Sequence, residues 1–143
     1  MAIDGLDDDT IRAVLTGVRR IALVGASANP DRAAHEIQGF LQDFGYDVTP
    51  VNPGLAGQIL QGRRVAARLD EAVPLEMVDV FRASAHVPPV VDDAIRLGAK
   101  VIWMQLGVVH AAAAARARAA GIVVVMNRCP AIETSRLDIR QLT

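Results

Sequence analysis

Short apolar segments alternate with longer segments of helical character along nearly the whole chain, and this alternation restricts the fold more than any other feature. The apolar segments are predicted strands and span residues 21–24, 47–51, 77–81, 101–105 and 122–126. The predicted helices between them span residues 33–44, 87–97 and 111–120. Strands that alternate with helices at this spacing form a parallel sheet with right-handed crossovers. We therefore predict an α/β fold, a three-layer, doubly wound parallel sheet of about five strands.

The two ends of the chain and the segment after the second strand have weaker patterns. A short N-terminal helix is predicted over residues 7–19, and a C-terminal tail over 130–143, with helical character from 133 to 142. The segment after the second strand is predicted as a loop over 54–62, a short strand over 64–67 and a helical turn over 69–72. With 143 residues and no linker or internal repeat, the chain fits one domain, residues 1–143.

The composition suits a sheet that is buried on both faces. Hydrophobic residues make up 52% of the chain and aromatic residues only 3%, so the core must consist mainly of Val, Ile, Leu and Ala. Such a mixture is typical of a parallel sheet covered by helices. The formal net charge of −1 argues against a nucleic-acid-binding surface. Because Lys100 is the only lysine, we expect any anion to be bound by arginine.

The single cysteine, Cys129, excludes an intramolecular disulfide, which fits a reducing compartment. Residues 1–9 are acidic and lack the apolar core of a secretory signal. No apolar segment approaches the roughly 20 residues that a membrane-spanning helix requires. We therefore expect a cytoplasmic protein without a membrane partner.

The loop after the first strand is a candidate binding site, because ligands of open parallel sheets bind beyond the carboxyl ends of the strands. This loop runs from Gly25 to Arg32 and leads into a helix. Gly25 permits a tight turn, and the helix offers free N–H groups to a pyrophosphate, to which Ser27 and Arg32 add a hydroxyl and a charge. The loop lacks the later glycines of the GxGxxG fingerprint. A strand-to-helix turn with a Ser or Asp cap is the alternative interpretation.

The residue after the second strand separates two classes of nucleotide. Domains of this kind that bind NAD usually have Asp or Glu there, to hold the ribose hydroxyls. This chain has Asn52, followed by Pro53 and Gly54. An amide does not repel a phosphate on the ribose, so the site is compatible with coenzyme A or NADP, and Arg63 and Arg64 are candidates to meet that phosphate. A turn formed by Asn-Pro-Gly is a second interpretation, compatible with the first.

The ends of the third and fourth strands supply further candidates. Phe81 and Arg82 precede another helix N-terminus, where Arg82 either contacts a ligand or forms a surface ion pair. Alternation along the fourth strand puts Trp103 and Gln105 on the same face. Trp103 fits a core position better than a ligand platform, whereas Gln105 is a candidate to line the site.

Segments along nearly the whole chain resemble the small coenzyme-A-binding proteins of the Rossmann type, which are related to the nucleotide-binding domain of the succinyl-coenzyme A synthetase alpha subunit. The matching segments are Val24-Gly25-Ala26-Ser27 with Pro30 and Arg32, Gly45-Tyr46 with Pro50-Val51-Asn52-Pro53, Asp79-Val80-Phe81-Arg82 with Val87-Pro88, the segment from Val101 to Gly107, and Asn127-Arg128-Cys129. The resemblance covers residues 21–133 and implies a Rossmann-like domain that binds coenzyme A or an acyl derivative.

The resemblance also implies a role for each loop. It implies that the pyrophosphate is held by Gly25, Ala26, Ser27, Ala28 and Arg32. It implies that the adenosine is bordered by Val51, Asn52 and Pro53, and that the rest of the groove is lined by Phe81, Arg82, Gln105 and Gly107. This chain departs from its relatives at Gly54, where they often have a Lys or Arg that can meet a phosphate.

The sequence contains no complete catalytic set that we can identify. The synthetase relatives work with an additional domain that carries a phosphorylated histidine, and this chain has no room for it. The three histidines, His35, His86 and His110, match neither a nucleophilic triad nor, with Cys129, a zinc site. His35 is close enough to the first loop to touch a ligand. Arg128 beside Cys129 favours a thiolate that can pair with the thiol of coenzyme A, and a buried, inert cysteine is the alternative.

Three functions therefore stay open. The leading hypothesis is a binding module without catalytic activity, namely a carrier, sensor or partner subunit for coenzyme A or an acyl derivative, either as a homo-oligomer or with a protein partner. The second is an enzyme or redox sensor that uses NAD or NADP, which Asn52 disfavours. The third is a structural or interaction protein with a vestigial groove, which Gly54 and the missing loop glycines leave open.

Overall fold

A computed structural model gives the structure of residues 2–142 and contains a five-stranded sheet. Its strands are β1 (Arg20–Val24), β2 (Asp47–Val51), β5 (Met77–Val80), β6 (Val101–Met104) and β7 (Val123–Val125). Their order is β2-β1-β5-β6-β7, and every neighbouring pair is parallel. The predicted α/β class and the five predicted strands are confirmed. The strand order reverses between β1 and β5, which is where folds of this kind bind ligands.

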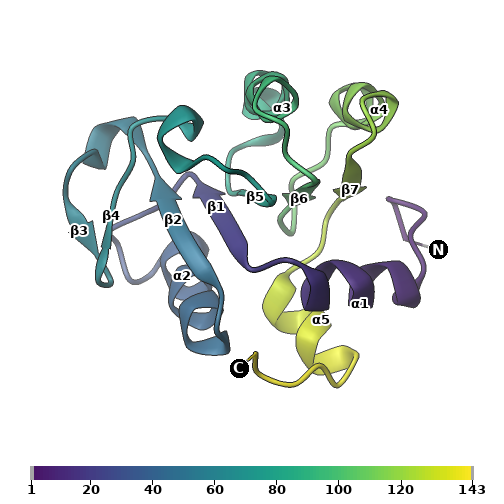
Figure 1. Cartoon of the computed structure of the whole chain (residues 1–143), viewed down its shortest axis with the longest axis horizontal. Helices are drawn as coiled ribbons and strands as arrows, with labels where there is room; N and C mark the ends of the chain where they lie inside the picture. Colours follow the sequence, from purple (N-terminus) through teal and green to yellow (C-terminus); the bar gives the residue numbers. More distant parts are fainter. Residues whose placement is uncertain (1, 143) are drawn as a thin grey trace.

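Helices cover both faces of the sheet. They are α1 (Asp8–Gly17), α2 (Ala33–Phe44), α3 (Val87–Arg96), α4 (Ala111–Ala119) and α5 (Pro130–Arg136). Figure 1 shows α3 and α4 on one side of the sheet and α1, α2 and α5 on the other. The three predicted layers are therefore present. None of the helices described between residues 2 and 142 is long and apolar enough to cross a membrane.

Each face of the sheet contributes to its own buried apolar cluster, and the alternation of side chains along β5 shows how. Val78 and Val80 belong to the cluster under α3 and α4, whereas Met77 belongs to the cluster under α1 and α2. Trp103 is fully buried in the second cluster, which confirms its assignment to the core. Its Nε1 donates a hydrogen bond of 2.8 Å to the carbonyl of Arg128 and so holds the chain after β7 against the sheet.

A carboxyl group, that of Asp79, is fully buried within this sheet. Asp79 pairs in register with Leu23 of β1 and Trp103 of β6. Neither of its carboxyl oxygens has a hydrogen-bond partner among residues 2–142. Burial raises the pKa of Asp79 well above its ordinary value of 3.8. The folded protein therefore favours the neutral acid at this position.

A short antiparallel ribbon lies beside β2, where a loop over 54–62 and a short strand over 64–67 were predicted. It consists of β3 (Ile59–Leu60) and β4 (Arg63–Arg64), and the two residues between the strands, Gln61 and Gly62, both have positive φ angles. Such a two-residue turn matches the twist of a hairpin. The predicted strand over 64–67 is wrong in extent, because beyond Arg64 the chain makes only an isolated bridge from Ala66 to Val51.

The last helix begins earlier than predicted. The sequence placed helical character within 133–142, whereas α5 runs from Pro130 to Arg136. Pro130 occupies the first helical turn, where its missing N–H costs no hydrogen bond. The helix ends at Arg136 with Leu137 as its cap, and Asp138 adopts a left-handed φ of 57°. The helix packs against α1 and α2, so its position is set by distant segments rather than by its own periodicity.

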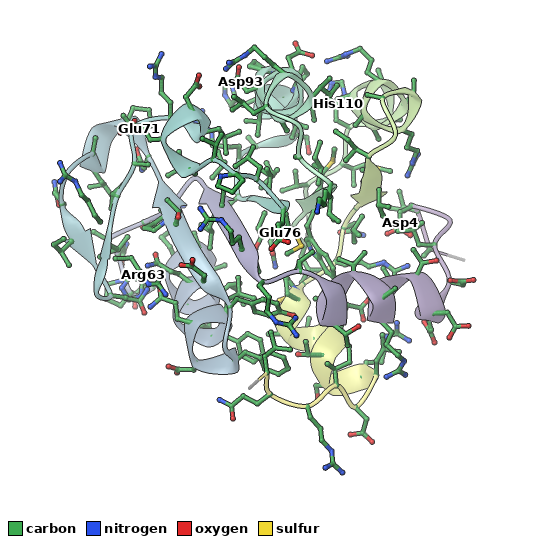
Figure 2. All side chains as sticks on the ribbon, in the orientation of Figure 1. Asp4, Arg63, Glu71, Glu76, Asp93 and His110 are labelled. Carbon is green, nitrogen blue, oxygen red and sulfur yellow. The ribbon has the colours of Figure 1, made fainter. Side chains whose placement is uncertain are left out.

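A buried ionic cluster joins the N-terminal segment to α5. Arg128 bonds to Asp4 at 2.8 and 2.9 Å and to Glu133 at 2.7 Å, while Asp4 also accepts the N–H of Met126 at 3.1 Å. Figure 2 shows Asp4 in the segment before α1. Burial alone raises the pKa of Asp4, but the hydrogen bonds from Arg128 and from backbone amides outweigh it and hold this pKa below its ordinary value. We call this group the Asp4–Arg128–Glu133 cluster.

Candidate functional site

Three neighbouring hollows lie along the carboxyl ends of β1, β2, β5 and β6. The basic hollow, of about 320 Å³, is lined by Gly25, Asn52, Pro53, Arg68, Arg82 and His86, among others. The loop hollow, of about 280 Å³, is lined by Gly25, Ser27, Arg32, Ala33, Ala34 and Phe81. The apolar hollow, of about 530 Å³, includes Ile37, Phe81, Arg82, Gln105, Leu106 and Cys129. Gly25, Phe81 and Arg82 each line two of them, so the three hollows adjoin one another, and together we call them the groove.

The basic hollow has two exposed arginines at its rim. Arg82 follows β5, and Arg68 precedes a short 3₁₀ helix, η2 (Leu69–Ala72), which was predicted as a helical turn. Neither guanidinium forms a salt bridge with any residue between 2 and 142. The surface ion pair considered for Arg82 is therefore not found. Two uncommitted guanidinium groups beside one hollow can bind phosphate oxygens.

The loop hollow offers backbone donors. The amides of Ser27 and Ala28, and those of the first two residues of α2, Ala33 and Ala34, have no hydrogen-bond partner among the described residues. The side chain of Arg32 lies at the same hollow. Free amides at the start of a helix, with a nearby guanidinium, form an anion-binding arrangement.

Other amides of the predicted phosphate loop are already used within the protein. Gly25 and Ala26 both donate to the carbonyl of Val51, at 3.0 and 3.3 Å. Asn29 donates to the Ser27 Oγ at 3.1 Å, and Asp31 donates to the Asn29 Oδ1 at 3.0 Å. These bonds shape the loop and leave the amides of Ser27, Ala33 and Ala34 at the loop hollow, and that of Ala28 beside it, for an anion.

Gly25 is required by a close approach between β1 and β5. Its φ is 92°, and a Cβ at this position would lie 2.4 Å from the carbonyl oxygen of Phe81. Phe81 in turn donates its amide to Val24 at 2.8 Å. The two strand ends therefore sit side by side at the point where the three hollows meet, and no other residue type fits there without moving the backbone.

The side chain of Asn52 forms two hydrogen bonds within the protein that its sequence position did not predict. Its Nδ2 donates to the carbonyl of Ala26 at 2.8 Å, and its Oδ1 accepts from Gly54 at 2.8 Å, at the start of η1 (Pro53–Leu55). An aspartate accepts the second bond but cannot donate the first. The amide thus joins the end of β2 to the loop after β1 and leaves this position uncharged.

The apolar hollow is lined mainly by uncharged side chains from α2, α5 and the loop after β6. Among them Gln105 is polar, only 5% exposed, and its Oε1 has no hydrogen-bond partner in the described chain. Nearby Gly107 is fixed by two neighbours, since its amide donates to Asn127 at 2.8 Å and its carbonyl accepts from Ser84 at 3.4 Å. The loop after β6 is therefore held in place from both sides.

The structure brings most of the predicted binding residues together. All of them line the groove except Ala26, which is buried, and Ala28, which is exposed beside it. Sequence reasoning did not identify Arg68 as a site residue and left His86 without a role, although both line the basic hollow. A clue to Arg68 was its place next to the predicted turn over 69–72, which returns the chain to the sheet.

Other predicted contributors lie elsewhere. Arg63 pairs with Asp47 at the amino end of β2, and neither Arg63 nor Arg64 lines the groove. Figure 2 shows Arg63 beside β2 and α2, apart from Asp93 on the helix that borders the basic hollow. The suggestion that these arginines meet a ribose phosphate is therefore wrong, because the β3–β4 ribbon carries them away from the strand ends.

The remaining titratable candidates do not form a catalytic set. His35 lines none of the three hollows, and the Nδ1 of His110 accepts from the amide of Ala113 as the cap of α4. Arg128, expected to act on Cys129, is instead bound by Asp4 and Glu133. Among residues 2–142, no group of three His, Cys, Asp or Glu side chains is placed to hold a metal ion.

The fold and the groove define the class of this protein: an α/β domain of the Rossmann type with a groove at the carboxyl ends of its strands. The model of a family described as a CoA binding domain matches residues 19–135, and the chain belongs to this family.

Two relatives match most of the chain. The uncharacterized protein YneT of Bacillus subtilis (strain 168) is 34% identical over 119 residues, which are 83% of this chain and 87% of YneT. The solved structure of a hypothetical protein from Pyrococcus horikoshii OT3 has a TM-score of 0.90 and 40% identity, over 96% of each chain. The Rex-family repressor RSP, in complex with beta-NADH, shares the fold alone, with a TM-score of 0.54 and 16% identity over 82% of this chain and 58% of RSP.

Proposed function

We propose that this chain is a binding module for coenzyme A or an acyl derivative, without a catalytic site of its own. The observation that carries the proposal is the adjacency of three chemically different hollows along one edge of the sheet. Coenzyme A has the same succession of parts: a nucleotide with a phosphate on its ribose, a diphosphate, and a long uncharged arm. Membership of the coenzyme-A-binding family supports this assignment.

In this proposal each hollow binds one part of the ligand. The basic hollow takes the adenosine, with Asn52 and Pro53 at its border and Arg68 near the ribose phosphate. The loop hollow takes the diphosphate on the free amides and on Arg32. The apolar hollow takes the arm, beside Phe81, Gln105 and Gly107. In this arrangement Arg68 replaces the basic residue that Gly54 does not provide.

The thermal stability of the purified protein with coenzyme A, compared with NAD, tests the proposal. A ligand at one hundred times its Kd stabilises the native state by about 2.7 kcal/mol, which raises the Tm of a domain of this size by roughly 10 °C. We expect coenzyme A to give such a rise and NAD to give little. An equal or larger rise with NAD contradicts the proposal.

NAD or NADP is the alternative ligand, and the likeness of the fold to that of RSP is its support. The Asn52→Asp variant separates the alternatives. It loses the bond to Ala26 and sets a carboxylate beside the ribose, so we expect weaker binding of coenzyme A. If the protein is an NAD-binding domain, the same variant retains or improves its affinity for NAD, because a carboxylate suits a free ribose.

A further inference from the structure

The apolar hollow contains two groups that the proposed function leaves unused, Gln105 and Cys129. Gln105 follows β6, and Cys129 follows β7, the neighbouring strand of the sheet. Both residues are almost fully buried from solvent, yet both line this hollow. The only sulfhydryl of the chain therefore faces the same space as an amide that lacks a partner.

An unpartnered amide inside a hollow indicates a polar ligand. The Oε1 of Gln105 is buried and has no hydrogen-bond partner among residues 2–142, although burial of an unpaired polar atom costs free energy. A primary amide can donate and accept at once. Its natural complement is a secondary amide in an otherwise uncharged chain, and the arm of coenzyme A contains two such amides before its terminal thiol.

The position of Cys129 is fixed from both sides along the chain. The carbonyl of Arg128 accepts the hydrogen bond of the Trp103 indole, and Pro130 starts α5 directly after the cysteine. The guanidinium of Arg128 is bound to Asp4 and Glu133 and does not enter the hollow. Cys129 thus lines the hollow from a segment of chain that is held on both sides.

We propose that Cys129 forms a mixed disulfide with the thiol of coenzyme A while Gln105 binds an amide of the arm. This inference rests on the proposed function, because the nucleotide must occupy the other two hollows. The reaction is an exchange with coenzyme A disulfide. The Cys129 thiol loses its proton to solvent, and the thiolate attacks one sulfur of the disulfide. A bond forms between Cys129 Sγ and that sulfur, the original disulfide breaks, and one coenzyme A leaves as a thiolate that takes up a proton.

The mass of the intact, folded protein after incubation with coenzyme A disulfide tests this step. Because the chain has one cysteine, every disulfide adduct reports on Cys129. Glutathione disulfide is the control reagent, since it offers the same bond without a nucleotide. We expect one coenzyme A per chain, formed at least about tenfold faster than the glutathione adduct, reversed by dithiothreitol and absent from Cys129→Ser.

The Gln105→Leu variant tests the role of the amide. We expect it to slow the reaction with coenzyme A disulfide severalfold more than the reaction with glutathione disulfide. The glutathione rate shows whether the variant has merely exposed the cysteine, because general opening of the hollow accelerates both reagents.

Two results overturn the inference. One is equal reaction of both disulfides with the folded protein, and the other is formation of the coenzyme A adduct only after unfolding. In either case a rise in Tm with reduced coenzyme A shows that the proposed function stands alone. If reduced coenzyme A gives no rise and no adduct forms, both the proposed function and the inference fail.

Discussion

The basic and the apolar ends of the groove are built by different means. The basic end places exposed guanidinium groups on loops, where Arg68 and Arg82 have no other partner in the described chain. The apolar end combines apolar side chains of α2 and α5 with the loops after β5 and β6, and it offers only a few polar groups, among them the buried Gln105. Charge can be recognised by mobile side chains in water, whereas an uncharged arm must be recognised by shape and by a few well-placed hydrogen bonds.

This difference between the two ends indicates which of them should determine the affinity for a ligand and which should determine the choice between ligands. Arginines at the basic end attract any phosphorylated nucleotide, and salt should weaken their contribution. The apolar end distinguishes ligands by the group that is attached to the far side of the diphosphate. Substitutions at the two ends should therefore change different properties, and by different amounts.

The largest effect should come from the Asp4–Arg128–Glu133 cluster, which supports the α5 wall of the apolar end. Breaking a buried ion pair costs about 3 kcal/mol, so we expect Asp4→Asn to lower the free energy of unfolding by that order. Its control is Asp8→Asn, because Asp8 pairs with Arg136 at the surface and should matter little. Urea denaturation of both variants measures the effect, and equal losses contradict the prediction.

The Asp4→Asn variant also tests how the stability of the protein depends on pH. The pKa of Asp4 is lower in the folded protein than its ordinary value of 3.8, so its stabilisation is present above that pH and is lost as the pH falls through the folded-state pKa. Asp4→Asn should therefore differ most from the wild type near neutral pH and converge with it in acid. Denaturation curves between pH 2 and pH 7 test this, and a constant difference would refute it.

The second effect concerns the point where the hollows meet. Gly25→Ala and Gly107→Ala both place a side chain at a positive φ, which costs about 1 kcal/mol. Only at Gly25 does the new Cβ collide with backbone, so this variant should lose roughly 3 kcal/mol and its affinity for coenzyme A. Thermal unfolding compares the two variants. Similar stability of both would show that the groove tolerates a methyl group at its centre.

The third effect isolates the charge of the basic end. Charge-assisted hydrogen bonds contribute about 1.5–3 kcal/mol, so Arg68→Ala should weaken coenzyme A binding about 10- to 100-fold. It should leave dephospho-coenzyme A, which lacks the ribose phosphate, nearly unaffected. Arg64→Ala is the matched control because Arg64 is exposed and lies outside the groove. Calorimetric titration measures the affinity of each variant for both ligands. An equal loss of affinity for both would show that Arg68 contacts a part of the nucleotide other than the ribose phosphate.

The smallest effect on the groove is expected from Asp79, which lines none of the three hollows. Burial raises the pKa of Asp79 in the folded protein, so the native state is most stable below the ordinary pKa of 3.8. As the pH rises above this value, the native state loses stability because burial disfavours the ionised carboxylate. Asp79→Asn should therefore raise the Tm more at pH 8 than at pH 4 and leave the Kd for coenzyme A unchanged. A lower Tm at pH 8 would show that the carboxyl has a partner.

The sequence predicted the strands of the main sheet because most of them are short, largely apolar segments, and β1, β5 and β6 are almost entirely buried. It did not predict the β3–β4 ribbon, whose strands have two residues each and no apolar pattern. It also misplaced α5, since that helix is positioned by Pro130 and by contacts with α1 and α2. Short elements held by distant contacts leave little local signal.

The site was predicted unevenly for the same reason. Gly25, Asn52 and Gln105 follow recognisable strands, so their place at one edge of the sheet could be inferred. Arg68 reaches the edge because η2 returns the chain there, and the predicted turn over 69–72 was the only local sign of this. The bond from Asn52 to Ala26 requires the register of β1 and β2, and sequence alone does not give that register.

The Asp4–Arg128 contact joins residues that are 124 positions apart. A nascent chain on the ribosome therefore carries Asp4 without its partner until translation has almost reached α5. Every residue of the basic hollow has been added by position 93, whereas the apolar hollow waits for residues up to 132. During synthesis the residues of the basic end are therefore complete before those of the apolar end. The segment that contains Cys129 is the last part of the groove to be translated.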